Sequence, residues 1–215
     1  MIIMKLMKHS TAILAVLTVC ACLMMSGCAY FKKAEPVDPY ATVGTVTEVT
    51  PTHYAEIDIQ NYGKITLALD AVTAPITTKN FVDLAQSGFY NGLTFHRIME
   101  GFMMQGGDPL GNGTGGSDKD ITGEFAENGI VNPLSHVRGA ISMARAMDPN
   151  SASSQFFIVH EDSIFLDGQY AVFGYVTEGI DVVDAVCTAA EPIDNNGTIL
   201  YDQQPVINSI TIREA

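Results

Sequence analysis

Apolar residues alternate with polar ones along much of the chain, which predicts a series of short β-strands. The first two predicted strands, residues 54–59 and 64–69, flank a polar turn at residues 61–63, as in a half-buried hairpin. Further strand candidates are residues 139–144, 155–159, 171–176 and 206–212. Many short strands with few helices favour a closed β-barrel.

Two segments have the spacing of helices instead. Residues 75–87 begin with Pro75, which suits a first helical turn, and we expect Thr77 or Thr78 to cap this helix. Residues 180–190 carry valines at helical spacing and contain Cys187. We expect Cys187 to be a buried structural thiol rather than a reactive one.

Residues 95–108, FHRIMEGFMMQGGD, combine a cation with several apolar side chains. We interpret them as two strands, residues 94–99 and 102–105, separated by a break at Glu100 and Gly101. Strict alternation would place Phe95 and Arg97 on the same face. A buried arginine is costly without acceptors, so this face should be concave and partly wet. Such a surface suits a ligand with an apolar body and an exposed carbonyl, for example a proline-containing peptide.

The first 28 residues have the pattern of an export signal: a basic start, an apolar run, and a small-residue exit at Ser26 and Gly27. Residues 25–28, MSGC, resemble the lipobox of bacterial lipoproteins, in which the cysteine is lipidated. We therefore expect a signal peptide over residues 1–27, a lipidated Cys28 followed by a tether through residue 52, and a folded domain over residues 53–215. This organisation predicts an exported protein attached by its lipid to the outer side of a membrane.

Composition and charge limit the kinds of ligand and partner that we expect for this protein. The 215 residues suit one domain with short appendages, and the net charge of −13 argues against a nucleic-acid partner. The histidines lack metal-ligand spacing, so no metal site is expected. Glycines 111, 113 and 116 match GxGxxG, but no strand–helix unit surrounds them and nearby aspartates would repel a phosphate. We therefore expect no cofactor.

Several ordered runs carry a resemblance to a known family. They are the stretch 95–108, GTGG at 113–116, SMA at 142–144, SQFFI at 154–158 and FLDGQYAVFG at 165–174. Together they resemble the cyclophilins, the peptidyl-prolyl cis-trans isomerases, over roughly residues 53–214. The resemblance implies a mainly β fold, a closed eight-stranded antiparallel barrel capped by two α-helices, and a monomer that acts on proline-containing, unfolded or partly folded polypeptides.

The resemblance also implies roles for individual residues. Arg97 would donate to the proline nitrogen or the preceding carbonyl, and Gln105 and Gln155 would bind the peptide backbone or orient Arg97. The apolar pocket for the proline ring would consist of Phe102, Met103, Phe157 and Leu166. We take Arg97, Gln105 and Phe102 as the catalytic set, with the others binding substrate.

Four further positions complete the predicted site. The backbone of Ala144 and Arg145 would pair with an extended peptide. Arg145 stands where the family commonly has asparagine, and its charge would favour acidic substrates. Phe165 stands where many eukaryotic members have tryptophan, and Tyr170 where they have histidine.

Two functions remain open at this stage. One is a lipid-anchored isomerase that accelerates X–Pro exchange in exported proteins and so assists their folding. The other is a binding module of the same shape that grips proline-containing segments without turnover. The intact set of Arg97, Phe102, Gln105 and Phe157 favours the isomerase.

Overall fold

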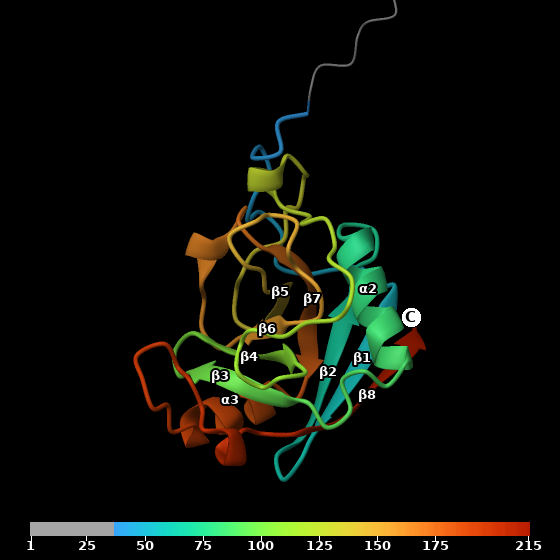
Figure 1. The fold of residues 1–215 in the computed structure, drawn as a ribbon. Helices are drawn as coiled ribbons and strands as arrows, with labels where there is room; N and C mark the ends of the chain where they lie inside the picture. The colour runs from blue at the N-terminus through green and yellow to red at the C-terminus, as the bar shows by residue number, and fades with distance from the viewer. Residues whose placement is uncertain (1–36) are drawn as a thin grey trace, which may run out of the picture. The chain divides into compact units, whose positions relative to one another are not determined.

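Eight antiparallel strands form one curled sheet in the computed structural model, which describes residues 37–215 (Figure 1). The strands are β1 (His53–Ile59), β2 (Gly63–Leu69), β3 (Thr94–Met99), β4 (Met103–Asp108), β5 (Ala140–Met143), β6 (Phe156–Val159), β7 (Ala171–Glu178) and β8 (Ile207–Glu214). Their order in the sheet is β3-β4-β6-β5-β7-β2-β1-β8. Every predicted strand is therefore present, with its ends shifted by no more than three residues. The predicted export signal and Cys28 lie outside the described residues.

The predicted closure of the barrel is not confirmed, because the sheet is open and curled. Strands β3 and β8 are its two edges, and in the described structure a single isolated bridge between Thr94 and Val206 connects them. The neighbouring Pro205 accepts a hydrogen bond from the amide of Phe95 at 2.9 Å but has no amide hydrogen to donate in return. A continuous ladder between the edges is thereby interrupted at its start.

Two helices pack against the sheet, as predicted. Helix α2 (Pro75–Gln86) packs against β7 and β8, and α3 (Ile180–Ala189) packs against β2 and β4 (Figure 1). None of the described helices has the length and apolar character needed to cross a bilayer. Cys187 in α3 is buried, as predicted, and burial raises the pKa of its thiol to about 12.

The predicted cap of α2 is wrong. The N-cap position is Ala74, and Thr77 and Thr78 lie buried inside the helix. The amide hydrogens of the first turn are instead accepted by the carboxylate of Glu124, at 3.1 Å from Ile76 N and 2.7 Å from Thr77 N. A distant loop thus supplies the acceptor that the local sequence lacks, which satisfies donors that every helix leaves unpaired.

The apolar side chains form two clusters on opposite faces of the sheet. Strand β6 shows the division most simply, because Phe156 and Ile158 belong to the cluster under the helices, whereas Phe157 and Val159 belong to the other. The second cluster also contains Met103. Residues predicted to bind substrate therefore come from the face of the sheet that the two helices leave uncovered.

Residues 37–52 contain no helix and no ladder strand, but they are attached to the sheet. Val46 forms an isolated parallel bridge with Leu134, and its amide donates to Pro133 O at 3.0 Å. The amide of Thr52 donates to Leu69 O at 2.8 Å. We call residues 43–49 the strap.

Candidate active site

A β-bulge at His96 sets the direction of Arg97. Phe95 pairs with Gly106 and Arg97 with Gln105, so His96 is an extra residue on β3. Phe95 consequently points into the core beneath the helices, and Arg97 points to the other face. The prediction that Phe95 and Arg97 share a face is wrong because the bulge interrupts the alternation between them.

The guanidinium of Arg97 is held from two sides. Its Nε donates to the carbonyl of Asn196 at 2.7 Å, and one terminal nitrogen donates to Oε1 of Gln105 at 3.1 Å. The other terminal nitrogen contacts only Met99 Sδ, at 3.4 Å, within the described structure. Since sulfur is a weak acceptor, this nitrogen retains donors for a ligand. Burial lowers the pKa of Arg97, but an arginine remains charged at any physiological pH.

Asn196 was missed by the sequence prediction. It lies in the turn 194–197, DNNG, where the carboxylate of Asp194 accepts hydrogen bonds from Asn196 N at 2.9 Å and Thr198 N at 3.0 Å. Asn-Gly pairs are a turn signal, so the turn itself could have been predicted. Nothing in the local sequence indicates that its carbonyl reaches a strand about a hundred residues earlier.

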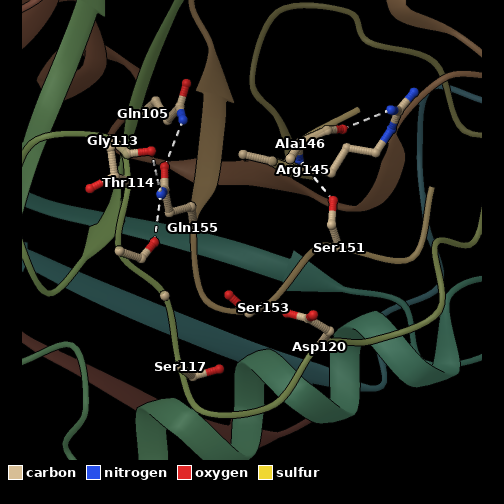
Figure 2. Close-up of a pocket in the computed structure, with 13 residues that line it drawn as sticks. Gln105, Gly113, Thr114, Ser117, Asp120, Arg145, Ala146, Ser151, Ser153 and Gln155 are labelled. Atoms are coloured by element: carbon tan, nitrogen blue, oxygen red, sulfur yellow. Dashed lines mark hydrogen bonds between the residues drawn. The ribbon is translucent and has the colours of Figure 1, made fainter. Parts of the chain in front are cut away.

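Two glutamines connect Arg97 to the glycine-rich loop. Gln105 donates from Nε2 to Oε1 of Gln155 at 2.9 Å, and Gln155 donates to the carbonyls of Gly115 at 2.8 Å and Gly113 at 3.2 Å (Figure 2). Gln105 therefore orients Arg97 directly, and Gln155 does so indirectly by holding Gln105. Orientation of Arg97 is one of the two roles predicted for these glutamines.

The glycine-rich loop offers its amides to an internal carboxylate. Asp108 is buried and accepts hydrogen bonds from Leu110 N at 2.8 Å, Asn112 N at 3.1 Å and Gly113 N at 2.6 Å. Burial alone would raise the pKa of Asp108, but these hydrogen bonds outweigh it and lower the pKa. These loop amides are thus occupied by a carboxylate of the chain itself.

One pocket of about 210 Å³ brings together most of the predicted site. The residues that line it are Arg97, Phe102, Met103, Gln105, Ala144, Arg145, Phe157, Leu166 and Tyr170. They come from strands β3, β4 and β6, from the turn between β3 and β4, and from the segments that follow β5 and precede β7. The pocket therefore combines the guanidinium groups of Arg97 and Arg145 and the amide of Gln105 with an apolar wall.

The other two predicted residues lie beside this pocket. Gln155 lines a neighbouring, more polar cavity of about 340 Å³, which also contains Ser151 and Asp120 (Figure 2). The side chain of Phe165 is 64% exposed and stacks on Phe102 with ring centroids 5.7 Å apart. Phe165 thus extends the outer rim of the apolar wall and does not form its floor.

The side chain of Arg145 is directed at the protein. Its Nε donates to Gln169 O at 3.0 Å, and its guanidinium lies 4.9 Å above the ring of Tyr170 and 5.0 Å from that of Phe125. Its contacts therefore do not support the expected preference for acidic substrates. They indicate that Arg145 braces Tyr170 at the edge of the pocket.

The backbone beside Arg145 fits the predicted pairing with a peptide. The amide of Ala144 donates to Gln155 O at 3.0 Å. In the part of the chain that the structure describes, the carbonyl of Ala144 and the amide of Arg145 have no recorded partner. These two groups belong to one trans peptide unit and point in opposite directions, so at most one of them can face the pocket.

No group of three or more His, Cys, Asp or Glu side chains in residues 37–215 is placed to hold a metal ion. The pocket itself offers a positioned guanidinium, amides and an apolar wall. Such a site can bind a peptide and stabilise charge that develops on it.

Comparison with known proteins identifies the family. A sequence model described as "Cyclophilin type peptidyl-prolyl cis-trans isomerase/CLD" matches residues 54–215. The chain belongs to the cyclophilins. This cyclophilin is 47% identical over 141 residues to a peptidyl-prolyl cis-trans isomerase of Helicobacter pylori strain J99, a match that covers 65% of this chain and 83% of that protein. It is 46% identical over 123 residues to peptidyl-prolyl cis-trans isomerase B of Bacillus subtilis, covering 57% of this chain and 82% of that one.

The fold leads to the same family. A crystal structure of a cyclophilin-type isomerase from Cryptosporidium parvum, determined in the presence of the dipeptide Ala-Pro, matches this cyclophilin with a TM-score of 0.66 and 30% identity. The match covers 75% of this chain and 99% of that one. The protein is therefore a peptidyl-prolyl cis-trans isomerase of the cyclophilin type.

Proposed function

We propose that this cyclophilin accelerates X–Pro isomerisation in exported polypeptides by stabilising the twisted amide with Arg97. The observation that carries the proposal is the position of Arg97: it lines the apolar pocket, is oriented by Gln105, and keeps donors without an oxygen acceptor among the described residues. A fixed donor above an apolar floor is what a proline amide needs.

The reaction requires stabilisation of charge and no covalent step. Rotation about a peptide bond has a barrier of roughly 18–20 kcal/mol because resonance stiffens the C–N bond. As the bond twists, resonance is lost and the nitrogen becomes pyramidal and electron-rich. A hydrogen bond from the Arg97 guanidinium to this nitrogen, or to the preceding carbonyl, strengthens along the path and so lowers the barrier.

The apolar wall performs the second task, which is to hold the proline ring still while the preceding residue rotates. Phe102, Met103, Phe157 and Leu166 surround the space below Arg97. The backbone at Ala144 and Arg145, just after β5, would pair with the peptide and fix it on one side of the rotating bond. Fixing one side while the other turns converts binding energy into catalysis.

The substrates that we propose are proline-containing segments of unfolded or partly folded proteins, whose folding the enzyme would assist. Uncatalysed X–Pro exchange takes tens to hundreds of seconds and can limit folding. The Ala-Pro dipeptide named with the Cryptosporidium parvum structure supports this choice, because it is the smallest unit of such a substrate.

We further propose that the enzyme is exported and held on the outer side of a membrane by lipid on Cys28, facing the periplasm if the cell has two membranes. The support is the signal-like pattern that ends in MSGC at residues 25–28. An anchor at this position would place the isomerase where exported chains emerge unfolded.

The deciding experiment measures turnover of a short X–Pro peptide by wild type and by Arg97→Ala. Loss of a charged hydrogen bond made mainly in the transition state should cost about 2–4 kcal/mol, or roughly a hundredfold in rate. Arg97→Lys should also be impaired, since lysine lacks the planar fork. The matched control is Arg213→Ala, which removes an arginine stacked on Tyr54 at 3.8 Å, outside the pocket. Full activity of folded Arg97→Ala would remove Arg97 from the mechanism.

A further inference from the structure

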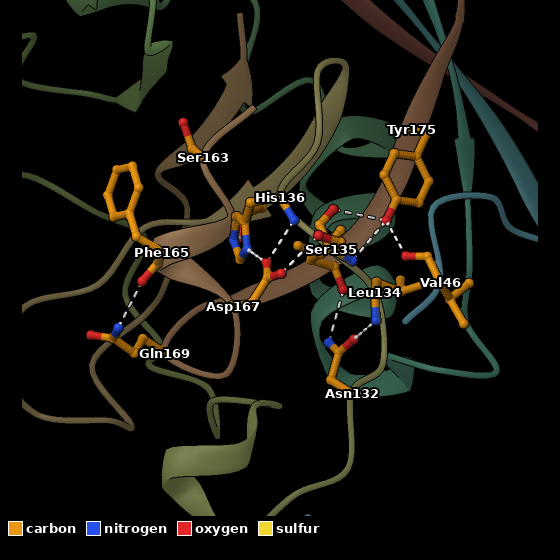
Figure 3. Close-up of polar contacts among 12 residues, drawn as sticks. Val46, Asn132, Leu134, Ser135, His136, Ser163, Phe165, Asp167, Gln169 and Tyr175 are labelled. Carbon is orange, nitrogen blue, oxygen red and sulfur yellow. Dashed lines mark hydrogen bonds and ion pairs between the residues drawn. The ribbon is translucent and has the colours of Figure 1, made fainter. Parts of the chain in front are cut away.

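Asp167 lies between pocket residues Leu166 and Tyr170 but does not line the pocket itself. Its carboxylate accepts hydrogen bonds at 2.7 Å from the amide of His136, from Nδ1 of His136 and from the hydroxyl of Ser135 (Figure 3). Its side chain is only 10% exposed. This carboxylate therefore anchors the segment that supplies one wall of the pocket to residues 135 and 136, together with a hydrogen bond from Ser163 N to His136 O at 2.7 Å.

His136 carries the connection to the other wall. Its ring is fully buried and stacks on Phe157, with centroids 5.9 Å apart and planes 13° from parallel. The edge of the ring also meets Tyr170, at 6.4 Å. Because a carboxylate can only accept, Nδ1 carries the proton, and Nε2 accepts from the hydroxyl of Ser142 at 3.0 Å.

Ser142, His136 and Asp167 are connected in the order of a hydrolytic triad, but they cannot act as one. Ser142 and His136 have no exposed surface, so no substrate carbonyl can reach the hydroxyl. What remains is a rigid connection from Asp167 through the imidazole to Phe157. Burial would raise the pKa of Asp167, but its hydrogen bonds outweigh that effect and keep the carboxylate charged.

The strap packs closely against the same carboxylate of Asp167. Gly44 has a left-handed backbone (φ +67°), and a Cβ at this position would stand 2.5 Å from Oδ2 of Asp167. Val43 lies next to Gly168, where an added Cβ would be 3.5 Å from it. Van der Waals contact of this kind leaves Asp167 no room to move towards the strap.

The strap is itself fixed by polar contacts to the sheet. The carbonyl of Val46 accepts from Ser135 N at 2.8 Å and lies 3.0 Å from the hydroxyl of Tyr175 (Figure 3). The same hydroxyl lies 2.9 Å from the carbonyl of Ser135. Ser135 is therefore held by Tyr175, by the strap and by Asp167 at once.

We propose that Asp167 is a positioning residue for the isomerase reaction, and that the strap acts through Asp167 and His136 to fix the wall of the proline pocket. This inference rests on the proposed function, because the wall it fixes is the one that binds the proline ring. The strap, which lies within the segment we expect to serve as tether, is thereby a working part of the enzyme.

Displacement of Asp167 should affect substrate binding and leave the chemical step largely unchanged. A displaced Asp167 would shift Leu166, Tyr170 and Phe157, which hold the substrate. Arg97 would stay in place, because its partners are Gln105 and Asn196 on other elements. We therefore expect a weaker Michaelis complex with little change in kcat.

The test compares Gly44→Ala with Gly92→Ala in the full chain. Both glycines have positive φ, so both variants suffer similar backbone strain, but a Cβ at Gly92 meets nothing within 4 Å. With an X–Pro peptide, Gly44→Ala should raise KM about five- to tenfold and leave kcat within about twofold, because a misplaced wall weakens binding. Gly92→Ala should change neither by more than about twofold. Equal KM values in the two variants would overturn the inference.

A second variant covers the case in which Gly44→Ala does not fold. Asp167→Asn keeps the shape of the side chain but loses the charge and replaces one acceptor oxygen by a donor. We expect a similar rise in KM, and loss of the Nδ1-protonated signature of His136 in ¹⁵N NMR spectra. A folded Asp167→Asn protein with wild-type KM would contradict the inference. Absence of turnover in the wild type would instead count against the proposed function, and peptide affinity would then report on the wall.

Discussion

Gln105 lies in β4 and Gln155 just before β6, and the Nε2 of Gln105 donates to the Oε1 of Gln155 at 2.9 Å. This bond fixes the orientation of both amides. Gln105 must turn its oxygen towards Arg97, and Gln155 must turn its nitrogen towards the carbonyls of the glycine-rich loop. A directed chain of hydrogen bonds therefore runs from the loop to the guanidinium that we propose to act in catalysis.

Gln155→Leu should lower kcat/KM about tenfold, because it removes the acceptor that orients Gln105 and, through it, Arg97. The fold should persist, since leucine fills a similar volume. The measurement is turnover of an X–Pro peptide, and the matched control is Gln60→Leu on the exposed turn after β1. If both variants turn over the peptide at the wild-type rate, Gln155 does not orient the site.

The strands and both helices could be predicted from the sequence because they depend on local patterns. Alternation over four to eight residues shows which segments are extended, and Pro75 marks the start of a helix. The bulge at His96 could not be predicted in this way. Whether β3 contains an extra, unpaired residue depends on how that strand pairs with β4. Side chains before the bulge then point to the opposite face of the sheet from the one that strict alternation predicts.

Long-range polar contacts at the site also could not be predicted from the sequence. The side chains that line the pocket could be predicted, but not the groups that hold them. The cap that Glu124 gives to α2 and the carbonyl that Asn196 gives to Arg97 connect segments nearly 50 and 100 residues apart. Such partners satisfy a donor after the chain has folded, and no spacing in the sequence marks them.

The free energy of unfolding should fall as the pH drops from 7 to 5, partly because of His96. This side chain is 4% exposed, and neither ring nitrogen has a hydrogen-bond partner among the described residues. Burial lowers the pKa of His96, the Asp108 carboxylate opposes this shift, and Arg97 adds to it. The unfolded chain thus takes up a proton near pH 6.5 that the folded chain does not, which costs up to about 1.4 kcal/mol per pH unit.

His96→Leu should therefore reduce this pH dependence and raise stability at pH 5, because it removes both the titration and two unpaired polar atoms. The pKa of His136 is also lowered by burial, so some dependence should remain. Urea unfolding of the wild type and the variant at pH 7 and pH 5 provides the measurement. The same loss of stability in both proteins would show that His96 does not contribute.

Cys28→Ala should abolish lipid attachment and release the enzyme from the membrane fraction. The thiol is the only atom of the MSGC motif that can accept a lipid through sulfur, and a single anchored chain plus tether is all that holds the domain in this proposal. The control is Cys187→Ala, which alters a buried thiol in α3. Membrane retention of Cys28→Ala at the wild-type level would contradict the anchor, while leaving the isomerase unaffected.

Phe157 in the pocket and Phe165 beside it should differ sharply in importance. Phe157 is 5% exposed, lines the pocket floor and stacks on His136, so Phe157→Ala should raise KM more than about tenfold and cost about 3–5 kcal/mol of stability. Phe157→Leu should restore much of the lost affinity and stability, because leucine refills most of the space.

Phe165 is 64% exposed, and Phe165→Ala removes only a ring stacked on the outer side of Phe102. We expect its KM to rise no more than about threefold. Titration of each variant with a slowly exchanging X–Pro peptide would distinguish the two residues, and comparable losses of affinity would mean that the rim binds the proline as strongly as the floor.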